Sequence, residues 1–164
     1  ARDEPEAVEV VRAALLRDGV TLLEKVGISD VRRDGPVVTV TLDGDSAVGR
    51  CVAGSHLLVA AGRRPNVENL GLDAAGVAFA PKGITVDARL RTSNRRIFAI
   101  GDVSGGPQFT HIAGYHAGIV IRNALFGLPA KVDYTALPWV TYADPELAHA
   151  GLTEAQARKG GHDV

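Results

Sequence analysis

The sequence predicts an α/β fold that contains an antiparallel β-meander, and two kinds of pattern support this prediction. Residues 56–61 and 97–100 are short apolar runs that suit buried parallel strands, and each run stops at a glycine. Residues 26–33, 37–42 and 48–52 alternate like strands and are separated by Asp-Gly turns. We therefore expect these three segments to form a small antiparallel meander, and the favoured interpretation is a connecting ribbon without chemistry.

Two longer segments have helical patterns. The first begins near Pro5, carries an apolar stripe and is expected to end before Gly19. The second covers residues 110–126, with Thr110 as its expected N-cap and a glycine stop directly after it. Shorter elements complete the prediction, namely strands at 20–23, 83–87 and 139–142, a helical turn at 70–72 and a last helix capped by Thr153.

The segment from 97 to 126 has the pattern of a cofactor pocket. Asp102 follows the second apolar run, and a glycine-rich loop then leads to the start of the second helix. In open α/β sheets ligands bind at such strand ends, where the backbone amides and the helix dipole face electron-rich groups. Small residues also leave one side of this helix nearly bare, namely Ala113, Gly114, Ala117 and Gly118.

The composition argues against several classes of partner. The net charge is −1 and the basic residues are scattered, which predicts neither nucleic-acid binding nor a polybasic membrane segment. No apolar run approaches the length of a bilayer span, and no signal-peptide pattern opens the chain. These features predict a soluble, cytoplasmic protein. A chain of this length without methionine is unusual, so we expect both ends to lie within a longer protein.

The cysteine and histidine residues do not predict a metal site. Cys51 is the only cysteine and has small or apolar neighbours, so we expect it to be a buried structural thiol. His111 and His116 are five residues apart on the second helix and are expected on different faces. The pair at Arg63 and Arg64 leaves two interpretations open, a basic phosphate clamp or a solvated loop.

Four segments in this order resemble the class I flavoprotein disulfide reductases, also called pyridine nucleotide-disulfide oxidoreductases. They are LLVAAGRRPN at 57–66, GITVD at 83–87, RTSNRRIFAIGDV at 91–103 and PWVTYADPELAHAGLTEAQA at 138–157. PQFTHIAGYHAGIVIRNALFG at 107–127 and the PWVTY segment are most similar to the branch that contains mercuric reductase and dihydrolipoamide dehydrogenase.

This resemblance implies an FAD-dependent oxidoreductase that passes hydride from NAD(P)H through FAD to a redox-active disulfide, and on to a small-molecule or disulfide substrate. It also divides the chain into three parts. Residues 1–62 would be the C-terminal half of a Rossmann-like NAD(P)-binding domain, 63–130 a returning segment of a Rossmann-like FAD-binding domain, and 131–164 the start of an α+β dimerisation domain. A homodimer is implied. Since the redox-active cysteine pair of the family is missing, the chain alone is expected to be inactive.

The resemblance further implies particular cofactor contacts. Asp102 would accept a hydrogen bond from a ribityl hydroxyl of FAD, and the start of the second helix would lie under the isoalloxazine ring. The residues implied for FAD are Asp102, Gln108, Phe109, Thr110, His111 and Ala113, and those implied for the nicotinamide dinucleotide are Gly62 and Val26. No catalytic residue and no metal ligand are expected in the chain.

A second hypothesis belongs to another functional class. The chain would then be a non-catalytic nucleotide-binding or protein-interaction module that associates through exposed strand edges. Flavin absorbance would separate the two hypotheses, because only the oxidoreductase requires bound FAD.

Overall fold

The computed structural model of the chain describes residues 3–44 and 49–164. Its secondary structure is mixed α/β with antiparallel strand pairs, in agreement with the predicted class. The chain forms two compact units. Unit 1 contains Gly62–Tyr142 and Glu146–Val164 together with residues 3–4, and unit 2 contains Pro5–Ala61 together with Ala143–Pro145.

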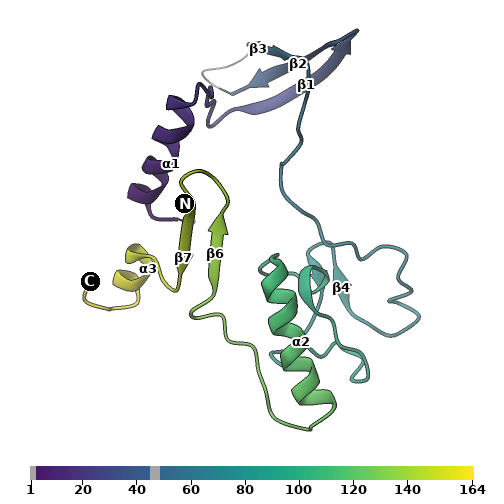
Figure 1. The fold of residues 1–164 in the computed structure, drawn as a ribbon. Helices are drawn as coiled ribbons and strands as arrows, with labels where there is room; N and C mark the ends of the chain where they lie inside the picture. Colours follow the sequence, from purple (N-terminus) through teal and green to yellow (C-terminus); the bar gives the residue numbers. More distant parts are fainter. Residues whose placement is uncertain (1–2, 45–48) are drawn as a thin grey trace. The chain divides into compact units, whose positions relative to one another are not determined.

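Unit 2 consists of one helix and a three-stranded antiparallel sheet. The helix α1 covers Pro5–Arg17, and the strands are β1 (Gly27–Asp34), β2 (Val37–Asp43) and β3 (Cys51–Gly54). The strands lie in the order β1-β2-β3 (Figure 1), with both pairs antiparallel. The predicted helix and meander are therefore confirmed, except that position 48 of the predicted third strand lies outside the described residues.

The predicted strand at 20–23 is wrong, because this segment has no regular secondary structure. A side-chain pair connects the following residue to α1 instead. Arg12 donates to both carboxylate oxygens of Glu24, at 2.7 and 2.8 Å. This hydrogen bonding lowers the pKa of the Glu24 carboxyl and raises that of Arg12. The segment is thus linked to the helix by side chains, while a strand would need a backbone neighbour.

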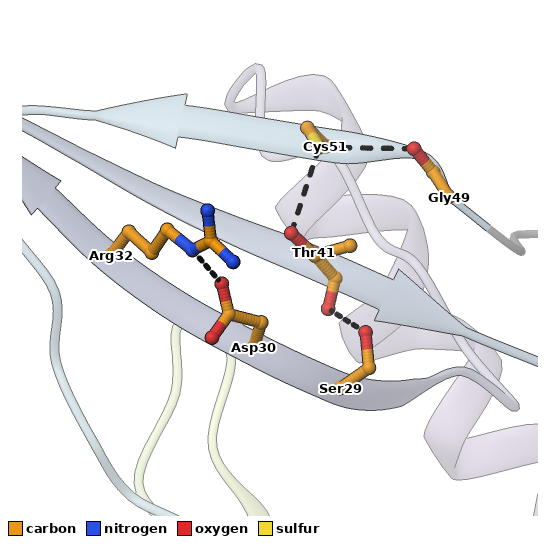
Figure 2. Close-up of polar contacts among 6 residues, drawn as sticks. All are labelled: Ser29, Asp30, Arg32, Thr41, Gly49 and Cys51. Carbon is orange, nitrogen blue, oxygen red and sulfur yellow. Dashed lines mark hydrogen bonds and ion pairs between the residues drawn. The ribbon is translucent and has the colours of Figure 1, made fainter.

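Cys51 is exposed, so the prediction of a buried thiol is wrong. It lies on β3, and all four residues of this strand are exposed. Figure 2 shows its sulfur beside Thr41 on β2 and the backbone of Gly49, each at 3.7 Å. Cysteine is usually buried when a second layer covers its strand, and no residue of β3 is covered in this way.

The predicted buried strand at 56–61 is also wrong. These residues have no assigned secondary structure other than a bend at position 61. Leu58 is 90% exposed and Val59 is 76% exposed. A parallel strand of this composition is buried by strands on both sides and helices on both faces. The described part of the chain supplies no strand that pairs with these residues.

Unit 1 has a small hydrophobic core built mostly from turns. The core residues are Val67, Val77, Ile84 and Ala99, and partly buried apolar residues pack around them. The strand β5 (Gly83–Ile84) contributes Ile84 to this core and pairs antiparallel with the exposed strand β4 (Phe79–Ala80). The predicted strand at 83–87 is therefore shorter than expected. The predicted helical turn at 70–72 does not form, and a series of hydrogen-bonded turns covers 72–76 instead.

The run 97–100 forms an isolated antiparallel bridge, so the predicted parallel strand is wrong. Phe98 bridges Arg91, and the backbone amide of Ala99 donates to the Leu90 carbonyl at 3.2 Å. The segment turns back on itself at Asn94, whose side-chain amide donates to the Ala75 carbonyl. Because its partner is the residue run just before it, the segment pairs locally, with Ala99 in the core and Ile100 exposed.

The helix α2 covers Thr110–Ala124 and is preceded by a short 3₁₀-helix, η1, at Gly101–Ser104. The predicted helix is confirmed, but its predicted cap is not. Phe109 is the N-cap residue and Thr110 is the first helical residue. The phenyl ring of Phe109 has no acceptor for the first-turn amides, and no side-chain cap bond forms.

A β-hairpin and a short helix follow α2 in the chain (Figure 1). The strands β6 (Pro138–Thr141) and β7 (Leu147–Ala150) are antiparallel, and Trp139 stacks on His149 with ring centroids 4.2 Å apart. The helix α3 (Glu154–Lys159) begins with a complete capping box between Thr153 and Gln156, as predicted for Thr153. No helix among the described residues is long and apolar enough to cross a membrane.

Two backbone segments of unit 1 approach each other very closely at Gly83 and Gly105. A Cβ atom on Gly83 would lie 2.9 Å from the Gly105 Cα and 2.9 Å from the Val103 carbonyl oxygen. Gly83 also has a φ of 131°, which side-chain-bearing residues rarely adopt. This contact joins β5 to η1 and therefore helps to place the turn that carries Asp102.

We predict that Gly83→Ala destabilises the chain by about 3 kcal/mol, since it adds steric overlap to backbone strain. Gly76→Ala is the matched control, because Gly76 also has a positive φ but no atom lies within 4 Å of its Cβ position. The control should cost only about 1 kcal/mol. Urea unfolding followed by circular dichroism measures both values, and equal losses would contradict the close approach.

Candidate functional site

The short 3₁₀-helix η1 (Gly101–Ser104), here called the Asp102 turn, is packed directly against the first turns of α2. Gly101 has a φ of 66°, and a Cβ atom there would lie 3.1 Å from the Cβ of Ala113. The turn is closed by Ser104, whose hydroxyl donates to the Gly101 carbonyl at 2.7 Å. Asp102 itself is exposed. The turn that carries Asp102 is therefore packed against the first turns of α2 without a bulky side chain in between.

The start of α2 is suited to an electron-rich group. Because Phe109 provides no side-chain cap, the first-turn amides keep the partial positive charge of an open helix N-terminus. Gln108 and Phe109 are half-buried, whereas Thr110 and His111 are exposed. Further along the helix, Gly114 and Gly118 have no atom within 4 Å of their Cβ positions. Of the small residues on the predicted bare side, Gly114 and Gly118 thus face open space, whereas Ala113 lies against Gly101.

A cavity of about 330 Å³ lies beside the same helix. One wall consists of residues of α2, and the other of the irregular segment 133–137 and Pro138, the first residue of β6. His111 spans the two walls, because its Nε2 donates to the Pro138 carbonyl at 2.9 Å. Tyr115 forms a second connection, since its hydroxyl accepts a hydrogen bond from the Asp133 amide at 2.8 Å. The pocket is therefore bordered by polar groups that link its walls.

His116 is the main residue of this region that was not among the cofactor-binding residues predicted from the sequence. Its side chain is 1% exposed, and it lies between the Asp102 turn and the wall segment. The Gly101 amide donates to Nδ1 at 3.0 Å, and the Tyr134 hydroxyl lies 2.6 Å from Nε2. The available signal was a lone histidine four residues after Ile112 on the apolar side of the helix.

Arg63 and Arg64 both bind acceptor groups within the chain. Arg63 donates to the Gln108 carbonyl at 2.9 Å, and Arg64 forms an ion pair with Glu68 at 2.8 Å. The phosphate-clamp interpretation gains no support from these contacts. Arg63 instead connects the backbone after Gly62 to the loop that leads into α2.

The predicted site residues fall into two groups. Asp102, Gln108, Phe109, Thr110, His111 and Ala113 lie together in η1, the following loop and the first turn of α2. Gly62 is the first residue of the longest segment of unit 1, has a φ of 108° and has no atom within 4 Å of its Cβ position. Val26 is a half-buried residue of unit 2, directly before β1. The described residues contain no group of histidine, cysteine, aspartate or glutamate side chains that could hold a metal ion.

Comparisons with known proteins agree with the resemblance found in the sequence. A family model described as pyridine nucleotide-disulphide oxidoreductase matches residues 2–117. A mercuric reductase of Streptomyces lividans is 42% identical over 165 residues, covering 98% of this chain and 34% of the relative. A dihydrolipoyl dehydrogenase of Geobacillus stearothermophilus is 37% identical over 164 residues, with the same two shares.

Solved structures give the same result. The Cu(II) complex of an HOCl-induced flavoprotein disulfide reductase from Escherichia coli matches with a TM-score of 0.88 and 29% identity. The match covers 99% of this chain and 37% of that structure. The chain thus spans about one third of the length of the curated relatives it matches.

The burial of His116 predicts a pH-dependent stability. Burial lowers the pKa of His116 below its ordinary value of 6.5, so the unfolded chain binds a proton there more readily than the folded chain. The free energy of unfolding should therefore fall as the pH decreases below about 6.5, and level off once the folded chain is protonated too. Urea unfolding between pH 5 and pH 7.5 measures this slope.

Two variants test the assignment of that slope to His116. His116→Phe should flatten it, whereas His162→Phe, which changes an exposed histidine, should retain it. The lowered pKa of the Asp133 carboxyl affects stability only at more acidic pH, because its ordinary value is 3.8. An unchanged slope in His116→Phe would contradict the prediction.

Proposed function

Because the chain belongs to the pyridine nucleotide-disulphide oxidoreductase family, we propose that it is part of an enzyme that passes hydride from NAD(P)H through FAD to a redox-active disulfide. The reaction would be of the mercuric reductase or dihydrolipoyl dehydrogenase type, the names of the similar proteins. The observation that carries the proposal is the packing of the turn that bears the exposed Asp102 against the first turns of α2, whose N-cap residue Phe109 makes no side-chain cap bond.

The residues of this region fit a flavin. A flavin needs a positive partner for the electron-rich side of its ring and acceptors for the hydroxyl groups of its chain. The open N-terminus of α2 offers the first, and Asp102 offers the second. The tight contact between Gly101 and Ala113 keeps the carboxylate close to the helix without a side chain filling the space.

Bound FAD would supply the hydride and electron transfer, and the residues of the chain would bind and orient it. Asp102 would hold a ribityl hydroxyl, and the amides at Thr110 and His111 would face the ring. Ala113 would leave room, as its side chain is a single methyl group. Gln108 and Phe109 would fix the approach to the helix, with the Gln108 carbonyl held by Arg63.

The remaining parts of the proposal concern the rest of the molecule. Gly62 and Val26 would line the site of the nicotinamide dinucleotide. Residues 1–62, 63–130 and 131–164 would belong to Rossmann-like NAD(P)- and FAD-binding domains and to a dimerisation domain, respectively. A homodimer and a cytoplasmic location are part of the same proposal. The single cysteine of the chain cannot form a pair, so the redox-active cysteines would come from outside these 164 residues.

The proposal is tested on the product of the open reading frame that contains this chain. We expect a yellow protein with flavin absorbance that oxidises NAD(P)H when Hg(II) or a lipoamide-type disulfide is added. A colourless protein with neither activity would overturn the proposal and favour a non-catalytic module.

The proposed role of Asp102 predicts a loss of FAD affinity in its variants. A charge-assisted hydrogen bond contributes about 1.5–3 kcal/mol, so Asp102→Ala should weaken FAD binding by about 10- to 100-fold. Asp102→Asn keeps an acceptor and should lose less. Asp73→Asn changes another exposed carboxylate of unit 1 and should bind FAD normally. Titration of the apoprotein with FAD measures the affinities, and normal binding by Asp102→Ala would contradict the assignment.

A further inference from the structure

His116 occupies a position on α2 that otherwise contains apolar residues. Ile112, His116 and Ile119 follow each other along the buried side of the helix, and all are at most 3% exposed. A polar ring in such a row is costly unless both of its nitrogens find partners. His116 has one partner at each ring nitrogen, the Gly101 amide at Nδ1 and the Tyr134 hydroxyl at Nε2.

The hydrogen bonds of His116 define which nitrogen carries the proton. The Gly101 amide can only donate, so Nδ1 must be the unprotonated acceptor of that 3.0 Å bond. The proton of the neutral ring then lies on Nε2, which donates to the Tyr134 hydroxyl at 2.6 Å. Protonating Nδ1 would place two N–H groups against each other. The titratable groups in ring contact with His116 are Tyr115 and Tyr134, and burial raises the pKa of the Tyr134 hydroxyl.

The two bonds connect three parts of unit 1 that do not adjoin in sequence. Nδ1 holds the residue directly before Asp102, and Nε2 holds Tyr134, which belongs to the same irregular segment that forms one wall of the pocket. The ring itself is carried by α2, whose N-terminus faces the same region. Tyr115, one residue earlier, adds a contact to Asp133.

We propose that His116 is a positioning residue for the Asp102 turn, and through it for FAD; this inference rests on the proposed function. Its Nδ1 keeps the Gly101 amide pointing into the helix, so the Asp102 carboxylate is held at the open start of α2. The Gly101 amide keeps the ring in the tautomer with an unprotonated Nδ1, and the bond to Tyr134 gives the protonated Nε2 a partner. An apolar side chain of similar size would fill the same space but would leave the Gly101 amide without this acceptor.

Two substitutions separate positioning from packing. His116→Phe keeps an aromatic ring but removes both hydrogen bonds. His116→Asn provides a side-chain oxygen that can accept from Gly101, although it cannot reach Tyr134 and leaves space unfilled. A packing role predicts that the phenylalanine variant is the milder one. The positioning role predicts the opposite order for every property that depends on the Asp102 turn.

The first measurement needs no flavin and uses the 164-residue chain. In ¹⁵N spectra, His116 should show an unprotonated Nδ1 and a protonated Nε2 at pH 7.5. Hydrogen exchange at the Gly101 amide should accelerate by about tenfold in His116→Phe, in keeping with the loss of one hydrogen bond. It should return towards the wild-type rate in His116→Asn, while His162→Asn should match the wild type. A protonated Nδ1, or unchanged Gly101 exchange in His116→Phe, would overturn the proposal.

The second measurement uses the apoprotein of the complete reading frame and titrates it with FAD. His116→Phe should weaken binding by about tenfold, the expected effect of losing one positioned hydrogen bond. His116→Asn should restore most of the affinity although its thermal stability stays reduced. Equal affinity of His116→Phe and wild type, or no rescue by asparagine, would overturn the proposal.

The two measurements distinguish failure of the inference from failure of the proposed function. A wild-type protein that binds no FAD would overturn the proposed function and, with it, the flavin-positioning role of His116. The exchange of the Gly101 amide would then still decide whether His116 holds the turn. If FAD binds but His116→Phe is unaffected in both measurements, the proposed function stands and the inference fails.

Discussion

The hydrogen bond from the Gly101 amide to His116 is the interaction on which the candidate site depends most. Gly101 is the first residue of η1. At this residue the chain leaves the small core of unit 1 and continues towards α2. Gly101 can approach the helix because it lacks a side chain, and the buried imidazole gives its amide an acceptor away from water. Together these two features hold the turn that carries Asp102 against the first turns of α2, a contact that local sequence preferences alone do not produce.

Further contacts around this bond connect segments that are far apart in the sequence. Arg63 holds the Gln108 carbonyl, His111 holds the Pro138 carbonyl, and the close approach of Gly83 and Gly105 joins β5 to η1. The core of unit 1 is correspondingly small and built from short strands and turns. Specific hydrogen bonds and close glycine contacts therefore fix the backbone conformation of this region to a large extent. These contacts explain how the pocket between α2 and the segment that follows it keeps a defined shape.

Local signals in the sequence predicted several elements well. The meander followed from alternation and Asp-Gly turns, α1 and α2 from helical periodicity, and the cap of α3 from Thr153, because each signal acts within a few residues. The runs at 56–61 and 97–100 were misjudged as buried parallel strands. Their apolar composition indicates what they could bury but not which backbone would pair with them, and the first remains exposed while the second pairs with its own neighbour. Cys51 was misjudged for the same reason, since burial on a strand depends on a covering layer.

The sequence by itself determined the family, because four separated motifs keep their order and spacing, and it identified Asp102 with the following helix as the candidate site. Only the tertiary structure showed that Phe109 leaves the helix start uncapped. It also revealed the roles of His116 and Arg63, each of which bonds to residues 15 or more positions away. The physical reason is that a donor or acceptor in the sequence has no partner until the chain is folded. Whether a histidine is a surface residue, a core residue or a link between loops is decided by what the fold places beside its two nitrogens.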